Sequence, residues 1–246
     1  MASGRERILT AEHSLTVESL LLWKQLGEGY QSGQTGCHFL APLIIDFPVA
    51  ETSDVPWYAK IVALLLALKA EDEYTARHSL RVTEISLAVG RELGLFPDEI
   101  EYLRWGSLLH DIGKIAVDPQ VKNKPGKLTP EEYRHIKLHA YVGACMVKPI
   151  VGDNVAKMIE HHHDHYDGNG HDQTVVGEDI PLGARIIAVA DAFDAMVFDR
   201  PYRYAMTREE AREEIRQCAN TQFDPRVVKG FINITRQNSP TGVSVI

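Results

Sequence analysis

Apolar residues recur at helical spacing from about residue 56 almost to the end of the chain. Segment 57–70 is strongly apolar, and Val82, Ile85 and Val89 then follow at steps of three and four, as on one face of an α-helix. No part of this region alternates apolar and polar residues in the manner of a half-buried strand. The pattern predicts an all-α fold, with at most a small β element near the N-terminus.

One expected helix has a well-marked start. Thr129 and Glu132 have the spacing of a capping box, and Pro130 stands between them at the first helical position. We therefore expect segment 128–147 to be a helix whose apolar face includes Tyr133.

Residues 1–55 differ in character from the rest of the chain. Segment 27–36 is rich in Gly, Ser and Gln, as loops are, and segment 38–49 is apolar but interrupted by two prolines. We expect residues 1–55 to form an N-terminal appendage of unknown role. Residues 56–246 are expected to form one helical domain with a C-terminal helical extension.

Charge and composition narrow the partners and the location that we expect. The net charge of −8 argues against a broad nucleic-acid-binding surface, so no DNA or RNA duplex is expected as a partner. Three widely spaced cysteines exclude a disulfide framework and a CxxC zinc site. The first residues lack an apolar core of signal-peptide length, and the longest apolar run, 61–68, is too short to span a bilayer. We expect a cytoplasmic protein without a membrane partner.

Several expected helices carry a histidine or an aspartate at the end of an apolar stripe. Any one such histidine is more often a hydrogen-bonded core residue than a metal ligand. Burying a carboxylate without a partner is costly, however, and buried charges are normally paired or bound to metal. A shared metal cluster would satisfy the whole set, which consists of His78, His110, Asp111, His139, His162, His163 and Asp191.

The adjacent pair His110 and Asp111 restricts the geometry of such a cluster. Neighbouring side chains on a helix diverge by about 100°. Both can therefore reach one metal only where a helix end points at it, and Gly113 is expected to end this helix. A carboxylate has two oxygens, so Asp111 could bridge two metals.

Three longer motifs carry a resemblance to a known family. "LLHDIGKIAV", "NKPGKLTPEEYRHIKLHAYVGA" and "VADAFDAMVFDRPYR" are similar to motifs of the HD-GYP branch of the HD-domain metal-dependent phosphohydrolases, over roughly residues 70–230. The resemblance implies an HD-domain helical bundle. It also implies an enzyme that hydrolyses cyclic di-GMP to linear pGpG, to GMP, or to both.

The resemblance assigns the metal ligands residue by residue. Asp111 would bridge two divalent metal ions. One ion would also be held by His78, His110 and Asp191, and the other by His139, His162 and His163. His161 falls outside the motif and is expected to be a flanking surface residue. Tyr74 occupies the position at which the family's third metal is associated with a glutamate, which favours two metals.

The kind of metal and the residues around the substrate can also be predicted. Mixed imidazole and carboxylate ligands favour iron or manganese over magnesium, and zinc and nickel also suit them. Lys114 could steady the scissile phosphate or protonate the leaving oxygen; the alternative is a surface lysine. Arg200 and Arg203 match phosphate-contacting positions, although a purely structural ion pair would also explain Arg200. Asp194 is expected to orient a ligand imidazole.

The motif that names the branch, Gly-Tyr-Pro, is altered here. Gly170 is followed by His171 and Asp172. His171 could stack on a base, donate a hydrogen bond to the substrate, or become an additional metal ligand. Two alternatives to the phosphodiesterase therefore stay open. One is a catalytically weak cyclic-dinucleotide sensor, and the other is an HD phosphohydrolase of another nucleotide. A homodimer or a signalling partner is compatible with each.

Overall fold

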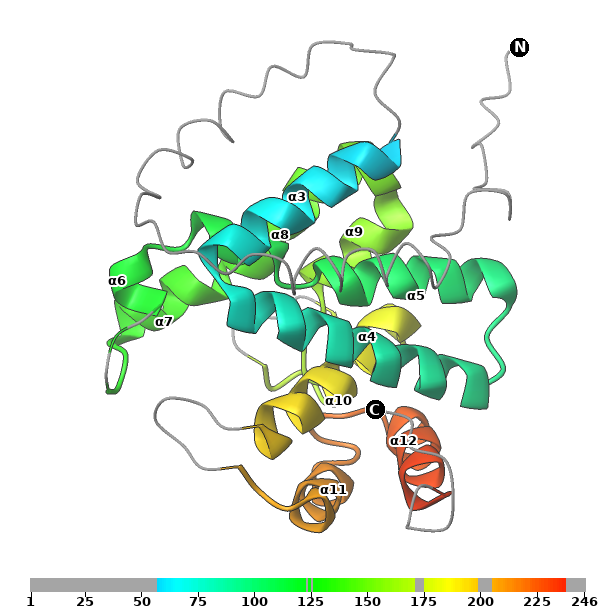
Figure 1. The fold of residues 1–246 in the computed structure, drawn as a ribbon. Helices are drawn as coiled ribbons and strands as arrows, with labels where there is room; N and C mark the ends of the chain where they lie inside the picture. Colours follow the sequence, from blue (N-terminus) through cyan, green and yellow to red (C-terminus); the bar gives the residue numbers. More distant parts are fainter. Residues whose placement is uncertain (1–56, 123, 125, 171–174, 199–204, 238–246) are drawn as a thin grey trace, which may run out of the picture. The chain divides into compact units, whose positions relative to one another are not determined.

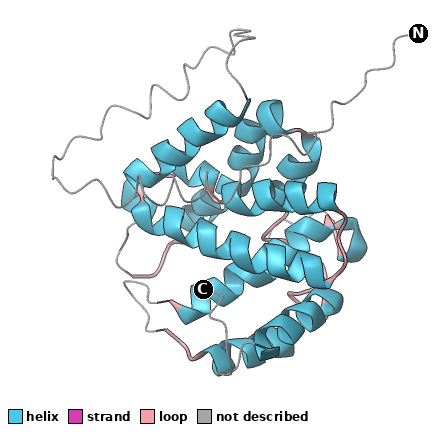
Figure 2. Ribbon diagram, turned by 45° about the vertical axis from the view of Figure 1, so that its right-hand side comes forward, coloured by secondary structure: helices cyan, strands magenta, loops and turns pink. Residues whose placement is uncertain are grey.

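Helices make up the regular structure of the described part of the chain, which is residues 57–122, 124, 126–170, 175–198 and 205–237 of a computed structural model (Figure 2). The α-helices are α3 (Trp57–Glu71), α4 (Glu73–Glu92), α5 (Pro97–Leu109), α6 (Pro119–Lys122), α7 (Pro130–Lys137), α8 (His139–Val151), α9 (Asp153–Glu160), α10 (Leu182–Val197), α11 (Arg208–Gln217) and α12 (Pro225–Gln237). Two 3₁₀ helices, η2 (Ile112–Ala116) and η3 (Gly177–Asp179), join them. Apart from an isolated bridge between Ala219 and Phe223, the described residues form no β-pairing, so the expected all-α fold is confirmed.

The helices pack around α4 and α10. In Figure 1, α4 and α5 lie side by side, with α3 above them and α10 to α12 below. Buried side chains from α4, α5, α10, α11 and α12 form one continuous hydrophobic core. Edge-on ring contacts join Trp57 to Trp105 at 5.3 Å between ring centres, and Phe193 to Phe231 at 4.9 Å.

The apolar stripe predicted on α4 faces this core. Val82 and Val89 are fully buried and Ile85 nearly so. His78, one turn before Val82, is only 3% exposed, so the stripe carries it into the interior. The apolar stripe predicted on α10 also faces the interior, since Ala184 and Ile187 are fully buried.

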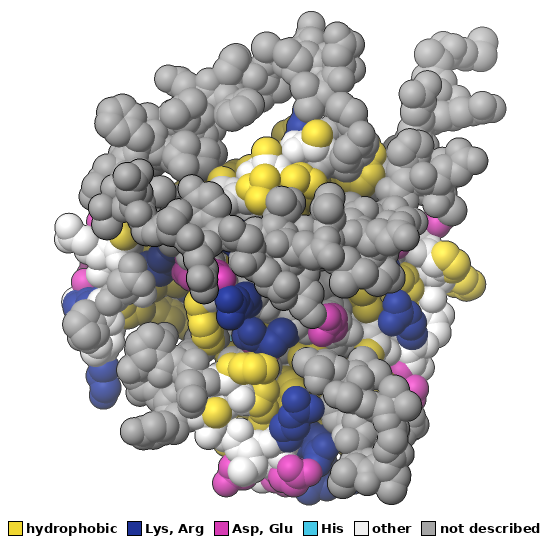
Figure 3. Space-filling view, viewed as in Figure 1, with side chains coloured by type: hydrophobic (Ala, Val, Ile, Leu, Met, Phe, Trp, Pro, Cys, Tyr) yellow, Lys and Arg dark blue, Asp and Glu magenta, His cyan; other side chains and the backbone are white. Residues whose placement is uncertain are grey.

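Helix α3 is apolar on more than its inner face. Ile61, Leu65 and Leu68 are buried, whereas Leu66 is 43% exposed. Figure 3 shows hydrophobic side chains on the visible side of this helix. Even so, none of the helices in the described residues combines the length and the hydropathy that crossing a membrane requires. The predicted appendage 1–55, with its possible β element, lies outside the described residues.

Helix α5 ends earlier than expected, at Leu109 rather than near Gly113. His110 caps the helix, Asp111 follows, and η2 contains Gly113. A Cβ atom on Gly113 would lie 2.1 Å from the carbonyl oxygen of His139 and 2.6 Å from the nitrogen of Gly143. Glycine is therefore required here for the close approach of η2 to α8, and does not serve to stop α5.

The expected helix over 128–147 is two helices. The capping box at Thr129 opens α7, but α7 ends at Lys137 and α8 begins at His139. Helix α7 contributes no buried residue, and Tyr133 is 43% exposed. The prediction that Tyr133 belongs to an inner apolar face is wrong, because α7 contributes no buried residue to the core.

Candidate metal centre

The structure brings together all seven predicted metal ligands. They come from α4, from the turn after α5, from the start of α8, from the turn after α9 and from α10. His78, His110 and Asp111 have ligand atoms within 4.8 Å of one another, and so do His139, His162 and His163. The seventh residue, Asp191, places Oδ1 3.0 Å from Nε2 of His78.

Imidazole rings join the two groups into one cluster. The ring centres of His110 and His162 are 5.1 Å apart, and those of His139 and His162 are 5.4 Å apart. His163 packs against His162 at 3.8 Å and against His139 at 5.1 Å. His162 therefore lies between His110, in the turn after α5, and His139 at the start of α8.

Asp111 lies where the two groups meet. Its Oδ2 atom is 3.4 Å from Nε2 of His110 and 3.7 Å from Nε2 of His78. Its Oδ1 atom is 3.3 Å from Nε2 of His139. The two oxygens of one buried carboxylate thus face different groups, which is the arrangement that a bridging ligand requires.

Three of the histidines are held by the same local hydrogen bond. In each, Nδ1 contacts the backbone carbonyl three residues earlier, and a carbonyl can only accept, so Nδ1 carries the proton. The histidines are His110, His139 and His162, and the acceptors are the carbonyls of Ser107, Ile136 and Ile159, at 2.7, 2.6 and 2.6 Å. The unprotonated Nε2 atoms are then left for another partner.

Those Nε2 atoms provide the test of whether metals fit. In all three histidines Nε2 is buried and has no hydrogen-bond partner among the described residues. Leaving a buried polar atom unsatisfied costs about 1–3 kcal/mol. Cations among the inward Nε2 atoms and the carboxylates of Asp111 and Asp191 would satisfy all of them, so the donor set fits divalent metal ions.

His78 is oriented by a carboxylate instead of a carbonyl. Its Nδ1 lies 2.6 Å from Oδ2 of Asp194. Asp194 is fully buried and also accepts two hydrogen bonds from Arg81, at 2.6 and 2.8 Å. The Arg81 guanidinium in turn lies 3.8 Å from the ring centre of Phe198. Asp194 therefore contacts a ligand imidazole as the sequence predicts, but Arg81 was missed, because its pairing with Asp194 spans 113 positions of the chain.

The charges of the cluster favour a cationic ligand. Burial alone would lower the pKa of His78, but hydrogen bonds to Asp191 and Asp194 outweigh it and raise this pKa to about 9. Burial lowers the pKa of His163 to about 3, with the nearby His139 adding to the effect. Burial would raise the pKa of Asp111, yet the charge of Lys114 and the contact with His110 hold it well below its usual value. At pH 7 the Asp111 carboxylate is thus ionised and the His163 imidazole is neutral.

A model of the HD domain matches residues 60–227 of this chain. The chain belongs to the HD-domain family. This match confirms the resemblance that the motifs predicted, and it covers every one of the seven clustered residues.

Relatives of this HD-domain chain include named enzymes. Cyclic di-GMP phosphodiesterase PA4108 of Pseudomonas aeruginosa is 40% identical over 172 residues, which cover 68% of this chain and 41% of that protein. The 3'3'-cGAMP-specific phosphodiesterase 3 of Vibrio cholerae is 38% identical over 157 residues, or 63% of this chain and 34% of that one. The chain therefore spans less than half the length of these relatives.

Solved structures support the fold. Bd1817, described as an HDG"Y"P protein from Bdellovibrio bacteriovorus, matches with a TM-score of 0.54 and 22% identity over 65% of this chain and 52% of that one. The HD-domain helical arrangement predicted from the motifs is therefore the observed one.

The remaining predicted site residues fall into two groups. Lys114 lies in η2, and its Nζ atom is 2.6 Å from Oδ2 of Asp111 with the side chain 28% exposed. The predicted substrate contacts Arg200, Arg203 and His171 lie outside the described residues and stay predictions.

His161 differs from expectation. Its side chain is only 17% exposed, and its Nδ1 atom is 2.9 Å from Oδ2 of Asp164. The expectation of a surface residue fails because His161 caps the end of α9, which turns its ring toward the following loop.

Proposed function

We propose that this chain is a metal-dependent phosphodiesterase that hydrolyses a cyclic dinucleotide, with cyclic di-GMP as the substrate and linear pGpG, GMP, or both as products. The observation that carries the proposal is the single buried cluster in which three Nε2 atoms have no hydrogen-bond partner among the described residues, and two of them lie 3.3 and 3.4 Å from the Asp111 carboxylate. The names of the relatives add support, since they are cyclic di-GMP and 3'3'-cGAMP phosphodiesterases.

The proposed metal ligands divide into two sets that share Asp111. His78, His110 and Asp191 would hold one ion, and His139, His162 and His163 the other. Bound divalent ions would neutralise the phosphate charge and activate a water molecule for in-line attack at phosphorus. Iron and manganese suit this mixed nitrogen and oxygen donor set best, and zinc and nickel are compatible with it.

Groups of the protein itself orient these ligands, and one of them could donate a proton to the leaving oxygen. The backbone carbonyls behind His110, His139 and His162 keep the proton on Nδ1, so that Nε2 stays available as a ligand. Lys114, partly exposed beside Asp111, would steady the scissile phosphate or donate a proton to the leaving oxygen. Arg200 and Arg203 would contact a substrate phosphate, as the resemblance implies, and His171, which departs from the family motif, would stack on a base or donate a hydrogen bond.

A second candidate function is favoured by the altered motif. With His171 and Asp172 in place of Tyr-Pro, the chain would be a sensor that binds a cyclic dinucleotide without turnover, or would act on another nucleotide. The similarity to a 3'3'-cGAMP-specific enzyme makes a mixed cyclic dinucleotide the first alternative substrate to examine.

Incubation of the metal-loaded protein with cyclic di-GMP, followed by chromatography of the products, tests the proposal. We expect linear product from the parent chain and none from the His110→Ala variant. Tight binding without product would favour the sensor. Product from 3'3'-cGAMP but not from cyclic di-GMP would show that the proposed substrate is wrong and that 3'3'-cGAMP is hydrolysed instead.

A further inference from the structure

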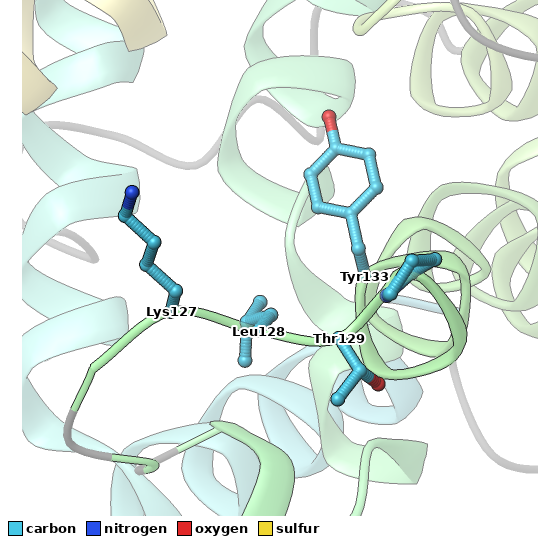
Figure 4. A pocket seen from close by; sticks show the side chains of 5 residues that line it. Lys127, Leu128, Thr129 and Tyr133 are labelled. Carbon is cyan, nitrogen blue, oxygen red and sulfur yellow. The ribbon is translucent and has the colours of Figure 1, made fainter.

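A cavity of about 550 Å³ lies beside the start of α7, and none of the clustered metal ligands lines it. Its lining consists of Lys127, Leu128, Thr129, Pro130 and Tyr133. Figure 4 shows the side chains of Lys127 and Tyr133 on opposite sides, extending in the same direction, with Leu128 between them. An aromatic face, an apolar residue and an ammonium group thus border one open space.

The polar groups around this cavity differ in whether they are already engaged. The hydroxyl of Thr129 accepts a hydrogen bond from the nitrogen of Glu132 and serves the helix cap. Lys124 nearby is paired with Glu132 at 2.7 Å. Lys127 is exposed and has no carboxylate partner among the described residues, so its ammonium is available to a ligand.

Tyr133 is also placed to meet a ligand. Its side chain is 43% exposed although tyrosine normally buries much of its ring, and the ring lines the cavity. Lys137, one turn later on the same helix, holds its Nζ atom 5.5 Å from the ring centre. Lys137 is not paired with a carboxylate of the described chain either. A flat ring with cations beside it attracts planar, electron-rich and anionic molecules.

The cavity lies at the start of α7, and the helix that follows α7 begins with a ligand of the proposed catalytic cluster. Lys137 is the last residue of α7. Lys137 thus approaches the Tyr133 ring and precedes His139, a cluster ligand, by two positions in the chain. A cyclic dinucleotide with one phosphate in that cluster would have a base left to occupy a neighbouring surface.

We propose that this cavity binds one purine base of the cyclic dinucleotide, that Tyr133 stacks on the base, and that Lys127 selects guanine. The proposal rests on the proposed function and specifies its substrate. Guanine presents two acceptors, O6 and N7, to a lysine ammonium, whereas adenine presents an amino donor at the corresponding position. Stacking on Tyr133 tolerates either base. Lys127 would therefore determine specificity, and Tyr133 would determine affinity.

Two substitutions in the metal-loaded chain separate these roles. Binding of the hydrolysis-resistant phosphorothioate analogues of cyclic di-GMP and cyclic di-AMP is measured by calorimetry, so that turnover is not needed. We expect Tyr133→Leu to weaken the binding of both analogues about tenfold. We expect Lys127→Met to weaken the cyclic di-GMP analogue about tenfold, leave the cyclic di-AMP analogue unchanged, and so abolish the preference.

Matched control variants lie outside the cavity. Tyr141→Leu on α8 removes a tyrosine that is 58% exposed, and Lys229→Met on α12 removes an exposed lysine. Neither should change the affinity for either analogue. Metal content and melting temperature should be the same in all four variants, because every substituted side chain is at the surface.

The outcomes distinguish this proposal from the proposed function. Unchanged affinities in Tyr133→Leu and Lys127→Met would overturn the base site, whether or not the parent chain hydrolyses cyclic di-GMP. Binding that depends on Tyr133 and Lys127 in a chain without turnover would support the base site and reject the phosphodiesterase. Absence of binding by the parent chain would overturn both.

Discussion

The imidazole of His78 and the carboxylate of Asp194 are 2.6 Å apart, although 116 positions separate them in the chain. The contact joins α4 to α10, and these two helices also carry the facing pair His78 and Asp191. Arg81 binds both oxygens of Asp194 and so neutralises a carboxylate that is fully buried. One ligand of the proposed metal centre is thus oriented by an ion pair that spans the core.

Asp194→Ala should weaken metal binding about 10- to 100-fold, because His78 loses the group that fixes its ring. Titration of the metal-free protein with Mn²⁺ measures the effect. Asp194→Asn keeps an oxygen that can accept from Nδ1, so it should lose less affinity than the alanine variant. Equal affinities in the parent and a folded alanine variant would show that Asp194 does not position His78.

Removing the metals should lower the stability of the fold. A ligand that binds only the folded chain stabilises it by about 2.7 kcal/mol at about 100 times its dissociation constant. We therefore expect a chelator to lower the melting temperature of the parent chain and Mn²⁺ to restore it. His110→Ala should show a much smaller change, since it removes one of the inward Nε2 atoms. A melting temperature insensitive to both additions would argue against a metal centre here.

Helical periodicity was enough to predict that the ligands converge, but it did not predict where the helices end. His78 shares a face with Val82, and that relation depends only on local spacing. The end of α5 at Leu109 depends on the contact between η2 and α8, which no local pattern encodes. Tyr133 is exposed because α7 as a whole contributes no buried residue, which its helical spacing does not predict.

The groups that support the ligands were also unequally predictable. The carbonyl contacts of His110, His139 and His162 all bridge three residues, so they follow once the helix ends are known. The pair formed by Arg81 and Asp194 bridges 113 positions. Its existence depends on the packing of α4 against α10, and a single sequence carries no local signal for that pairing.

Gly113→Ala should destabilise the fold and weaken metal binding together. The added Cβ atom would lie 2.1 Å from the His139 carbonyl oxygen, so η2 and α8 must separate. Overpacking of this kind costs about 1–3 kcal/mol or more, and the separation would also move Asp111 away from His139. Urea denaturation and Mn²⁺ titration measure the two effects.

Gly94→Ala provides the control for this substitution. Gly94 has a φ of 77° but no atom within 4 Å of an added Cβ, so alanine there strains the backbone without meeting a neighbour. We expect a moderate loss of stability with unchanged metal affinity. If Gly113→Ala behaved in the same way, close approach to His139 would not be what the glycine provides.

Asp72, at the start of α4, should make the stability of the helix carrying His78 depend on pH. Its carboxylate accepts hydrogen bonds from the nitrogen and hydroxyl of Thr75, at 3.0 and 2.8 Å, and lies 3.6 Å from Nζ of Lys122. Burial would raise the pKa of Asp72, but Thr75 and Lys122 outweigh it and lower the pKa below its usual 3.8. A pKa lower in the folded than in the unfolded chain stabilises the fold above pH 3.8, and this stabilisation is lost as the pH falls through the folded-state pKa.

Asp72→Ala should therefore cost about 1 kcal/mol of unfolding free energy at pH 7, the usual value of a helix cap. Asp72→Asn keeps a cap acceptor but not the charge, so its difference from the parent chain isolates the charge-dependent part. That difference should shrink toward zero as the pH is lowered below 3.8, in urea denaturation of the metal-free protein. A difference that stayed constant from pH 7 down to pH 3 would mean that the Asp72 charge contributes nothing to holding α4 in place.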